Sequence, residues 1–344
     1  MKVSYLDTKD AVGKMLSHDI TKIEKGTFKG PLFKKGHIIK EEDVETLLDL
    51  GKNRIYLIEL EPGDLHENEA GLRVARALQG PGLEISGPAE GKLELSATRR
   101  GLFKVDVELL TQINSLPDLS VATLHTNIPL EIGEKVAGTR VIPLVVREET
   151  VQQVEQICAA KPPLSVQPYL QYKMGGVITG REVFEGRIKD GFAPVLKSKA
   201  SFYDQEEPEI LYAPDDVDII AENIKKLLAR GCNLILVTGG MSVDPDDVTP
   251  VGIKKIGAEI IRYGAPVLPG AMFLLAYKGE IPIVGLPACA MYYRTTILDL
   301  VLSRIMIGEK VTARDIASLG HGGFCRTCEP CLYPHCPFGK GGNL

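Results

Sequence analysis

The most regular hydrophobic pattern lies in the second half of the chain, where short apolar runs alternate with segments of helical periodicity. The run Leu234–Val237 has four consecutive apolar residues and is followed directly by Thr238-Gly239-Gly240. Such a run, bounded by a turn, is typical of a strand buried in a parallel sheet. Thr238 and the two glycines are therefore expected at the carboxyl end of that strand.

Strand and helix patterns alternate from Met174 to about residue 310. Apolar runs predict further strands at 177–178, 210–212, 272–277 and 281–284. Helices are predicted over 192–202, over a stripe with Ile220 and Ile224, and over a stripe with Leu298 and Val301. This order predicts the α/β fold class, with a mostly parallel sheet covered by helices on both faces in three layers.

The first half of the chain has short alternating runs between glycines, so it is expected to be rich in β-structure. A helix is predicted over 41–50 and a strand over 54–60. Lys161-Pro162-Pro163 is typical of a linker. Four histidines without a partner at catalytic spacing are interpreted as structural or surface residues: His18, His37, His66 and His125. The predicted regions are a β-rich part with one or two subdomains at 1–165, an α/β domain at 166–312 and a tail at 313–344.

Composition narrows the class of protein. The 344 residues are 44% hydrophobic and 25% charged, as in ordinary globular domains, and the net charge is −5. Nucleic acid is not an expected partner, because its binding needs a basic surface. The start of the chain lacks the apolar core of a signal peptide, and no apolar run is long enough to span a bilayer. We therefore expect no membrane partner and a cytoplasmic location.

The loop after Leu234–Val237 has the features of an anion site. Adjacent glycines let the backbone approach a ligand closely, and Thr249-Pro250 opens a predicted helix whose amino end adds positive partial charge. A phosphate or pyrophosphate is the expected guest. The alternative is a plain turn in which Asp247 only caps the helix.

Other strand ends are expected on the same rim: Thr179–Glu182, Pro214–Asp216 and Gly285–Pro287. The polar segment 186–190 is expected to fold over a bound anion, with Arg187 or Lys189 as its charge partner. Asp190, Asp215 and Asp247 would repel a phosphate unless a cation lay between them. A magnesium ion resolves that conflict, although helix capping is an alternative role for Asp215.

Together these motifs, in this order, resemble the molybdopterin-binding domain of the MoeA and MogA type over about residues 170–310. The resemblance implies a molybdopterin pocket in which Asp247 and Asp215 are the catalytic residues. The implied ligand-binding residues are Thr179, Gly180, Glu182, Asp190, Asp216, Thr238, Gly239, Gly240, Met241, Ser242, Thr249, Gly285 and Pro287.

The family implies a transferase of molybdenum cofactor biosynthesis, which either adenylylates molybdopterin with Mg-ATP or uses the adenylylated form to insert molybdate. Ala288-Cys289-Ala290 departs from the Gly-Asn-Pro that usually follows Gly-Leu-Pro in the family. This departure favours the alternative of a non-catalytic carrier or chaperone that hands the pterin to a molybdoenzyme. Relatives of the domain commonly assemble, so a homo-oligomer is among the expected partners.

Four of the seven cysteines lie close together near the end of the chain: Cys325, Cys328, Cys331 and Cys336. In a reduced compartment, this spacing favours a metal site. Zinc and a [4Fe–4S] cluster both suit four thiolates, so both stay open, and a cluster would allow redox gating of cofactor handling. The alternative is a disordered, thiol-rich tail.

Overall fold

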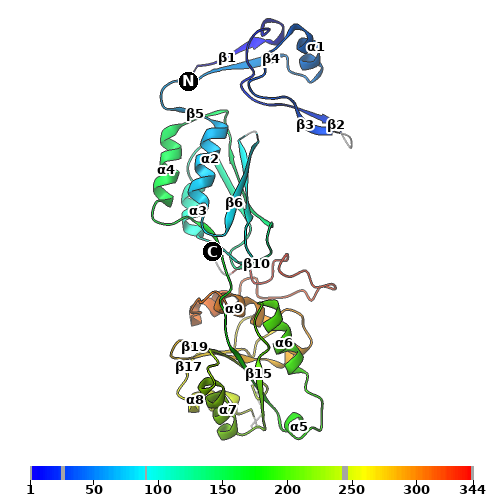
Figure 1. Cartoon of the computed structure of the whole chain (residues 1–344), viewed down its shortest axis with the longest axis vertical. Coiled ribbons are helices and arrows are strands. Elements are labelled where there is room, and N and C mark those ends of the chain that lie inside the picture. Colours follow the sequence, from blue (N-terminus) through cyan, green and yellow to red (C-terminus); the bar gives the residue numbers. More distant parts are fainter. Residues whose placement is uncertain (1, 25–27, 90, 242–246, 342–344) are drawn as a thin grey trace. The chain divides into compact units, whose positions relative to one another are not determined.

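The computed structural model describes residues 2–24, 28–89, 91–241 and 247–341 (Figure 1). The chain divides into two compact units. The first comprises Met1–Thr98, Asp106–Leu124 and Gly133–Ser165, and the second comprises Arg99–Val105, His125–Ile132 and Val166–Leu344. In the described part of the chain, no helix is both long and apolar enough to cross a membrane.

The first unit begins with two antiparallel strand pairs. Strand β1 (Lys2–Asp7) pairs with β4 (Arg54–Glu59), and β2 (Ile20–Glu24) pairs with β3 (Phe28–Phe33). A 3-10 turn, η1 (Thr8–Asp10), and helix α1 (Glu41–Asp49) complete this part. Its small core contains Ala11, Leu16, Ile20, Ile39, Leu47 and Ile55. The predicted helix at 41–50 and strand at 54–60 are both confirmed to within one residue.

The rest of the first unit contains a four-stranded antiparallel sheet in the order β6 (Leu83–Ala89), β7 (Lys92–Ala97), β11 (Lys135–Val141) and β9 (Leu119–Thr123). A two-stranded sheet joins β5 (Asp64–His66) and β12 (Val145–Arg147). The helices are α2 (Glu67–Leu78), α3 (Val107–Asn114) and α4 (Glu148–Cys158). The region is β-rich as predicted.

Two polar groups of this unit have structural roles. Arg73 on α2 forms ion pairs of 2.7 Å with Glu148 and 2.8 Å with Glu155, so it joins α2 to α4. His66 is buried, its Nδ1 accepts the Asn68 N–H at 3.2 Å, and its Nε2 donates to the Ser17 carbonyl at 3.0 Å. Burial lowers the pKa of His66, which suits a neutral structural histidine.

The second unit is built on a six-stranded sheet (Figure 1). Its strand order is β15 (Glu209–Ala213), β14 (Met174–Thr179), β16 (Leu234–Thr238), β19 (Ile281–Leu286), β18 (Leu274–Lys278) and β17 (Glu259–Tyr263). The first four strands run parallel, while β18 and β17 are antiparallel to their neighbours. Strand β17 was not predicted from the sequence.

Helices cover both faces of this sheet because its buried strands are apolar on both sides. On one face, Ile178 and Leu236 pack with residues of α6 (Phe192–Phe202), α9 (Ile297–Ile305) and α10 (Ala313–Ser318). On the other, Val177 and Val237 pack with α7 (Val217–Ala229) and α8 (Thr249–Lys255). The predicted three-layer α/β fold is confirmed. The short elements α5 (Arg181–Phe184) and η2 (Ala288–Met291) follow β14 and β19.

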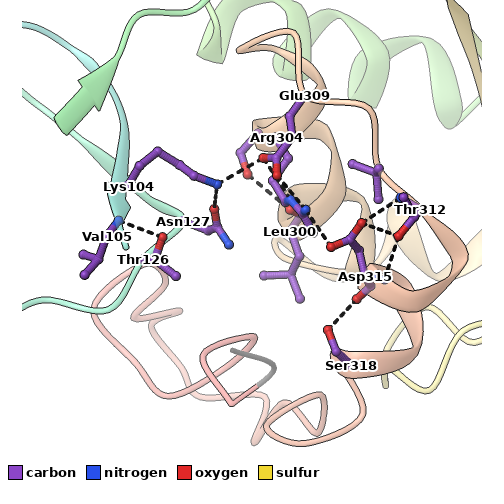
Figure 2. Close-up of polar contacts among 12 residues, drawn as sticks. Lys104, Val105, Thr126, Asn127, Leu300, Arg304, Glu309, Thr312, Asp315 and Ser318 are labelled. Atoms are coloured by element: carbon purple, nitrogen blue, oxygen red, sulfur yellow. Dashed lines mark hydrogen bonds and ion pairs between the residues drawn. The ribbon is translucent and has the colours of Figure 1, made fainter. Parts of the chain in front are cut away.

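A further sheet has the strand order β10 (Ile128–Leu130), β8 (Gly101–Val105) and β13 (Leu164–Gln167). Strands β8 and β10 belong to the second unit, although both precede residue 165, the boundary expected from the sequence. Figure 2 shows the polar network that holds them there. Lys104 donates to Asn127 at 2.6 Å and to Glu309 at 3.1 Å. Arg304 binds Glu309 with two bonds of 2.7 and 3.1 Å and Asp315 with one of 2.9 Å.

The charges of this network compensate one another. Burial opposes the charge on Arg304, but the hydrogen bonds and charges of Glu309 and Asp315 outweigh it and raise its pKa. Burial lowers the pKa of Lys104. Since an unpaired buried charge is costly, all four groups are expected to depend on one another.

Candidate functional site

The strand-end turn after β16 requires its two glycines. Gly239 and Gly240 have φ angles of +84° and +57°, in the left-handed region. A Cβ on Gly239 would lie 2.4 Å from the Thr179 carbonyl oxygen, and one on Gly240 would lie 2.6 Å from Thr249 Oγ1. Only glycine fits either position without displacing the neighbouring chain.

Buried threonines hold this turn from behind. Thr179 Oγ1 donates to the Thr238 carbonyl at 3.0 Å, and Thr249 Oγ1 donates to the Gly239 carbonyl at 2.9 Å. The Thr249 N–H also donates to the Gly240 carbonyl at 3.1 Å. Thr238 Oγ1 is buried, and no partner for it lies among the described residues. These three predicted binding residues therefore support the turn from its buried side.

A pocket of about 720 Å³ opens beside the turn. Four stretches of chain surround it: Gly239–Met241 with Asp247, Leu268–Met272, Leu286–Cys289 with Tyr293, and Phe324–Thr327. Asp247 and Arg326 are the charged residues among these. Of the residues predicted from the sequence, Gly239, Gly240, Met241, Asp247 and Pro287 border the pocket, whereas Ser242 lies outside the described part of the chain.

Two walls of the pocket are not among the residues predicted from the sequence. The stretch Leu268–Met272 contains Pro269-Gly270, a turn signal by which it could have been found. Gly270 has a φ angle of +129°, and a Cβ there would lie 2.5 Å from Ile297 Cγ2. The stretch Phe324–Thr327 overlaps the cysteine pattern, which was interpreted only as a metal site. Nothing in the local pattern of either stretch indicates that it meets the Gly239 turn.

The other predicted carboxylates are engaged at helix starts. Asp215 Oδ2 accepts the Arg181 N–H at 3.0 Å, at the beginning of α5. Asp216 caps α7 by accepting two N–H groups, at 2.8 and 3.0 Å. Asp190 accepts the N–H groups of Phe192 at 2.7 Å and Ala193 at 3.1 Å. Among the described carboxylates, Asp247 is the one that borders the pocket.

The remaining predicted residues are not among those that line the pocket. Gly180, with a φ angle of +131°, is the N-cap of α5, and Glu182 lies in its first turn. Gly285 lies beneath Met241, because a Cβ on it would be 2.3 Å from the Met241 sulfur. Arg187 forms an ion pair of 2.5 Å with Glu185, and neither it nor Lys189 borders the pocket.

Two polar side chains near the pocket have a raised pKa. Tyr263 donates to the Met241 carbonyl at 2.8 Å, and its pKa is raised by burial and by the charge of Asp247. Cys289, in the segment that replaces the family's usual Gly-Asn-Pro, borders the pocket, and burial raises the pKa of its thiol. A raised thiol pKa disfavours the nucleophilic thiolate.

The four clustered cysteines border a second, smaller cavity of about 40 Å³. All four are free thiols, and Cys331 Sγ lies 3.4 Å from Thr295 Oγ1. Tyr333 also borders this cavity, and its buried hydroxyl has no hydrogen-bond partner among the described residues. Within the described ranges, no three histidine, cysteine or acidic side chains are close enough to hold a metal ion together.

Two parts of the chain match models of known protein families. Residues 175–306 match the model of a family described as a probable molybdopterin binding domain. This part of the chain is similar to the domains of that family. Residues 5–59, in the first unit, match a second model, a domain of unknown function (DUF8806).

Individual relatives are similar to part of the chain. The molybdopterin molybdenumtransferase of Synechococcus elongatus is 24% identical over 147 residues, which are 40% of this chain and 36% of that protein. A protein of Archaeoglobus fulgidus is 34% identical over 79 residues, 23% of this chain and 34% of its own length. The chain thus spans about a third of the length of these curated relatives. The solved structure of the molybdopterin biosynthesis enzyme MoaB from Thermus thermophilus has 19% identity and a TM-score of 0.33, covering 40% of this chain and 98% of its own.

Proposed function

We propose that the molybdopterin-binding domain of this chain binds molybdopterin, or its adenylylated form, in the pocket beside Gly239 and Gly240. The observation that carries the proposal is the position of this turn at the mouth of a pocket of about 720 Å³, inside the matched domain. Paired glycines with positive φ angles let backbone approach a phosphate closely. The lining is mostly apolar, which suits a flat heterocycle.

The proposed reaction is magnesium-dependent molybdate insertion or adenylyl transfer, with Asp247 as the protein's ligand to the metal. Magnesium is commonly held by one or two carboxylates plus substrate phosphates, so one carboxylate in the pocket is a fitting donor set. Asp215 is proposed to act indirectly, since its carboxylate already accepts the Arg181 N–H at 3.0 Å. It would then position the start of α5 beside the strand end.

A non-catalytic carrier is the second candidate, and it is favoured by the carboxylates. Asp190 and Asp216 are used as caps of α6 and α7, which leaves Asp247 as the acid that borders the pocket among the described residues. A single carboxylate suffices to bind a magnesium–phosphate group, whereas the transfer of a phosphoryl-linked group usually needs more positioning groups.

The test is a binding titration of molybdopterin with the full-length protein, purified without oxygen. Mg-ATP, or molybdate with the adenylylated pterin, is then added and the pterin products are separated. Asp247→Asn should lower turnover by at least about a hundredfold if the carboxylate holds the metal in the transition state. The matched control is Asp218→Asn, an exposed carboxylate of α7 outside the pocket.

The outcomes separate the candidates. A new pterin species that depends on Asp247 supports the transferase. Tight binding with no new species supports the carrier. If molybdopterin does not bind, the domain retains the family fold without the family ligand, and the proposed function is wrong.

We also propose that the four thiols around the second cavity bind a zinc ion or a [4Fe–4S] cluster. Their common cavity supports this proposal, as does the buried Tyr333 hydroxyl beside them, which has no hydrogen-bond partner among the described residues. Metal analysis of anaerobically purified protein should find about one centre per chain, lost in the Cys328→Ser/Cys331→Ser double variant. A metal-free, folded and active protein would contradict it.

A further inference from the structure

We propose that Phe324 and Arg326, from the cysteine-rich segment, are ligand-binding residues of the pocket. In this proposal Arg326 pairs with the phosphate of the ligand, and Phe324 covers its ring. The inference rests on the proposed function for the identity of the ligand, but it concerns a part of the chain beyond the matched range 175–306.

The backbone fixes this segment at the pocket edge. The Leu268 N–H donates to the Gly323 carbonyl at 2.8 Å, and the Cys325 N–H donates to the Leu268 carbonyl at 2.8 Å. These bonds form a parallel bridge between Leu268 and Phe324. A Cβ on Gly323 would lie 2.4 Å from the Leu319 carbonyl oxygen, so the approach requires glycine. The segment is therefore joined to the Leu268 wall.

The core anchors the segment from its other side. Phe338, at the end of the same loop, is buried in the core cluster shared with α9 and α10. Cys325, Tyr333 and Cys336 are partly buried and pack against that cluster. Gly339 also donates its N–H to the Gly322 carbonyl at 2.9 Å. Two ends of the loop are thus tied together, which limits how far Arg326 can move away from the pocket.

The second feature that supports a role for Arg326 is the charge of the pocket lining. Asp247 and Arg326 are the two charged side chains among the described lining residues, so Arg326 supplies the single cation there. Its side chain is exposed and forms no ion pair with any described carboxylate. An anionic ligand beside Asp247 needs positive charge, and a guanidinium presents paired N–H donors that match phosphate oxygens. Arg187 and Lys189, expected from the sequence to do this, do not border the pocket.

Phe324 supplies an apolar surface at the same place. Its side chain is 74% exposed, and the neighbouring pocket residues Leu268 and Tyr293 are 53% and 43% exposed. Large apolar side chains left in solvent around a pocket mark a surface that another molecule covers. A planar aromatic ligand is a suitable cover, since ring stacking adds to the gain from burial.

The same segment borders both cavities. Phe324, Cys325 and Arg326 line the large pocket and also the small cavity of the four cysteines. The chain that carries Arg326 therefore runs between the pocket and the four cysteines.

The experiment compares the affinities of the full-length protein for molybdopterin and for inorganic pyrophosphate by calorimetric titration. Arg326→Gln should weaken both about tenfold to a hundredfold, as expected for loss of a charged hydrogen-bond donor. Arg326→Lys should weaken both less, since it keeps the charge. Phe324→Ala should weaken molybdopterin but leave pyrophosphate unchanged. The matched control is Arg314→Gln, an exposed arginine outside the pocket lining, which should change neither.

The outcomes distinguish this inference from the proposed function. Binding of molybdopterin that Arg326→Gln leaves unchanged overturns the inference and leaves the function standing. Pyrophosphate binding that depends on Arg326, without any molybdopterin binding, supports the inference and overturns the function. Absence of binding by both probes overturns both.

Discussion

Two walls of the same pocket are built in different ways. The wall at Gly239–Met241 follows a buried parallel strand, and two threonine hydroxyls hold its turn at 2.9 and 3.0 Å. The wall at Phe324–Thr327 follows no strand of the sheet and is held by two backbone bonds to Leu268. The supports of the first wall are buried threonine side chains. The second is a loop whose geometry depends on side chains packed beneath it.

The two walls therefore have different tasks: one holds the backbone of the pocket, and the other presents side chains to a ligand. In the strand-end wall most of the predicted residues turn out to hold the backbone, and Asp247 supplies the charge. In the loop wall the exposed side chains Phe324 and Arg326 face no described partner and are available to a ligand. A rigid scaffold with variable loops commonly divides these tasks in this way. Four predictions test the division.

The largest effect is expected for the ion-pair network of Arg304, Glu309 and Asp315, which lies outside both walls. Arg304→Ala should lower the free energy of unfolding by about 3–5 kcal/mol, because Asp315 would lose its pair with Arg304 and Glu309 would be left with Lys104 alone. Denaturant unfolding of the full chain measures this. The control is Arg187→Ala, whose pair with Glu185 is exposed and should contribute less than about 1 kcal/mol. Equal losses in the two variants would mean that the network is not a support.

The second prediction concerns thiol reactivity. Burial raises the pKa of Cys158 to about 11, whereas Cys328 in the loop wall's segment is exposed. Alkylation at pH 8 should modify Cys328 first and Cys158 at least about a hundredfold more slowly, since each pKa unit removes a factor of ten in thiolate. Site-resolved mass spectrometry gives both rates.

The pH dependence of Cys158 has a definite sign. The pKa of Cys158 is higher in the folded state than in the unfolded state. Its contribution to the free energy of unfolding is therefore complete at pH values below the unfolded-state pKa. That contribution declines as the pH rises toward 11. A Cys158 alkylation rate that levels off near pH 9 would show that the thiol is not buried.

The third prediction measures the fit of the strand-end turn. Gly239→Ala and Gly231→Ala both place a Cβ at a positive φ angle, +84° and +86°, but Gly231 has nothing within 4 Å of the added atom. Both should cost roughly 1–3 kcal/mol in backbone strain. Gly239→Ala should cost more, because the Thr179 carbonyl must move away. Equal unfolding free energies for the two variants would mean that the turn can accommodate a Cβ at Gly239 without moving the Thr179 carbonyl.

The smallest effect is expected at the loop wall. Phe324→Ala removes a side chain that is 74% exposed, so the free energy of unfolding should change by no more than about 0.5 kcal/mol. The thermal midpoint, measured beside the wild type, tests this. A larger loss would mean that Phe324 supports the fold, and its proposed role in ligand binding would then lose its basis.

Sequence patterns predicted much of the α/β unit because its signals are local. The strand that begins at Leu234, the helix at 192–202, the helix opened by Thr249-Pro250 and the glycine turn all follow from runs, stripes and turn residues in neighbouring positions. Strand β17 was missed, since Glu259–Tyr263 alternates weakly and lies at the sheet edge. The segment 99–105 was placed with the first half, because the contacts of Lys104 with Asn127 and Glu309 join residues far apart in the chain.

By itself, the sequence determined the layered α/β fold, the position of Gly239 and Gly240 at a strand end, and the clustering of four cysteines. These depend on side-chain period and backbone freedom, which are local properties. Only the tertiary structure decided that Leu268–Met272 and Phe324–Thr327 close the pocket and that Asp190 and Asp216 cap helices. These contacts depend on which distant segments of the chain pack together. The spacing of residues along the chain does not indicate which segments do so.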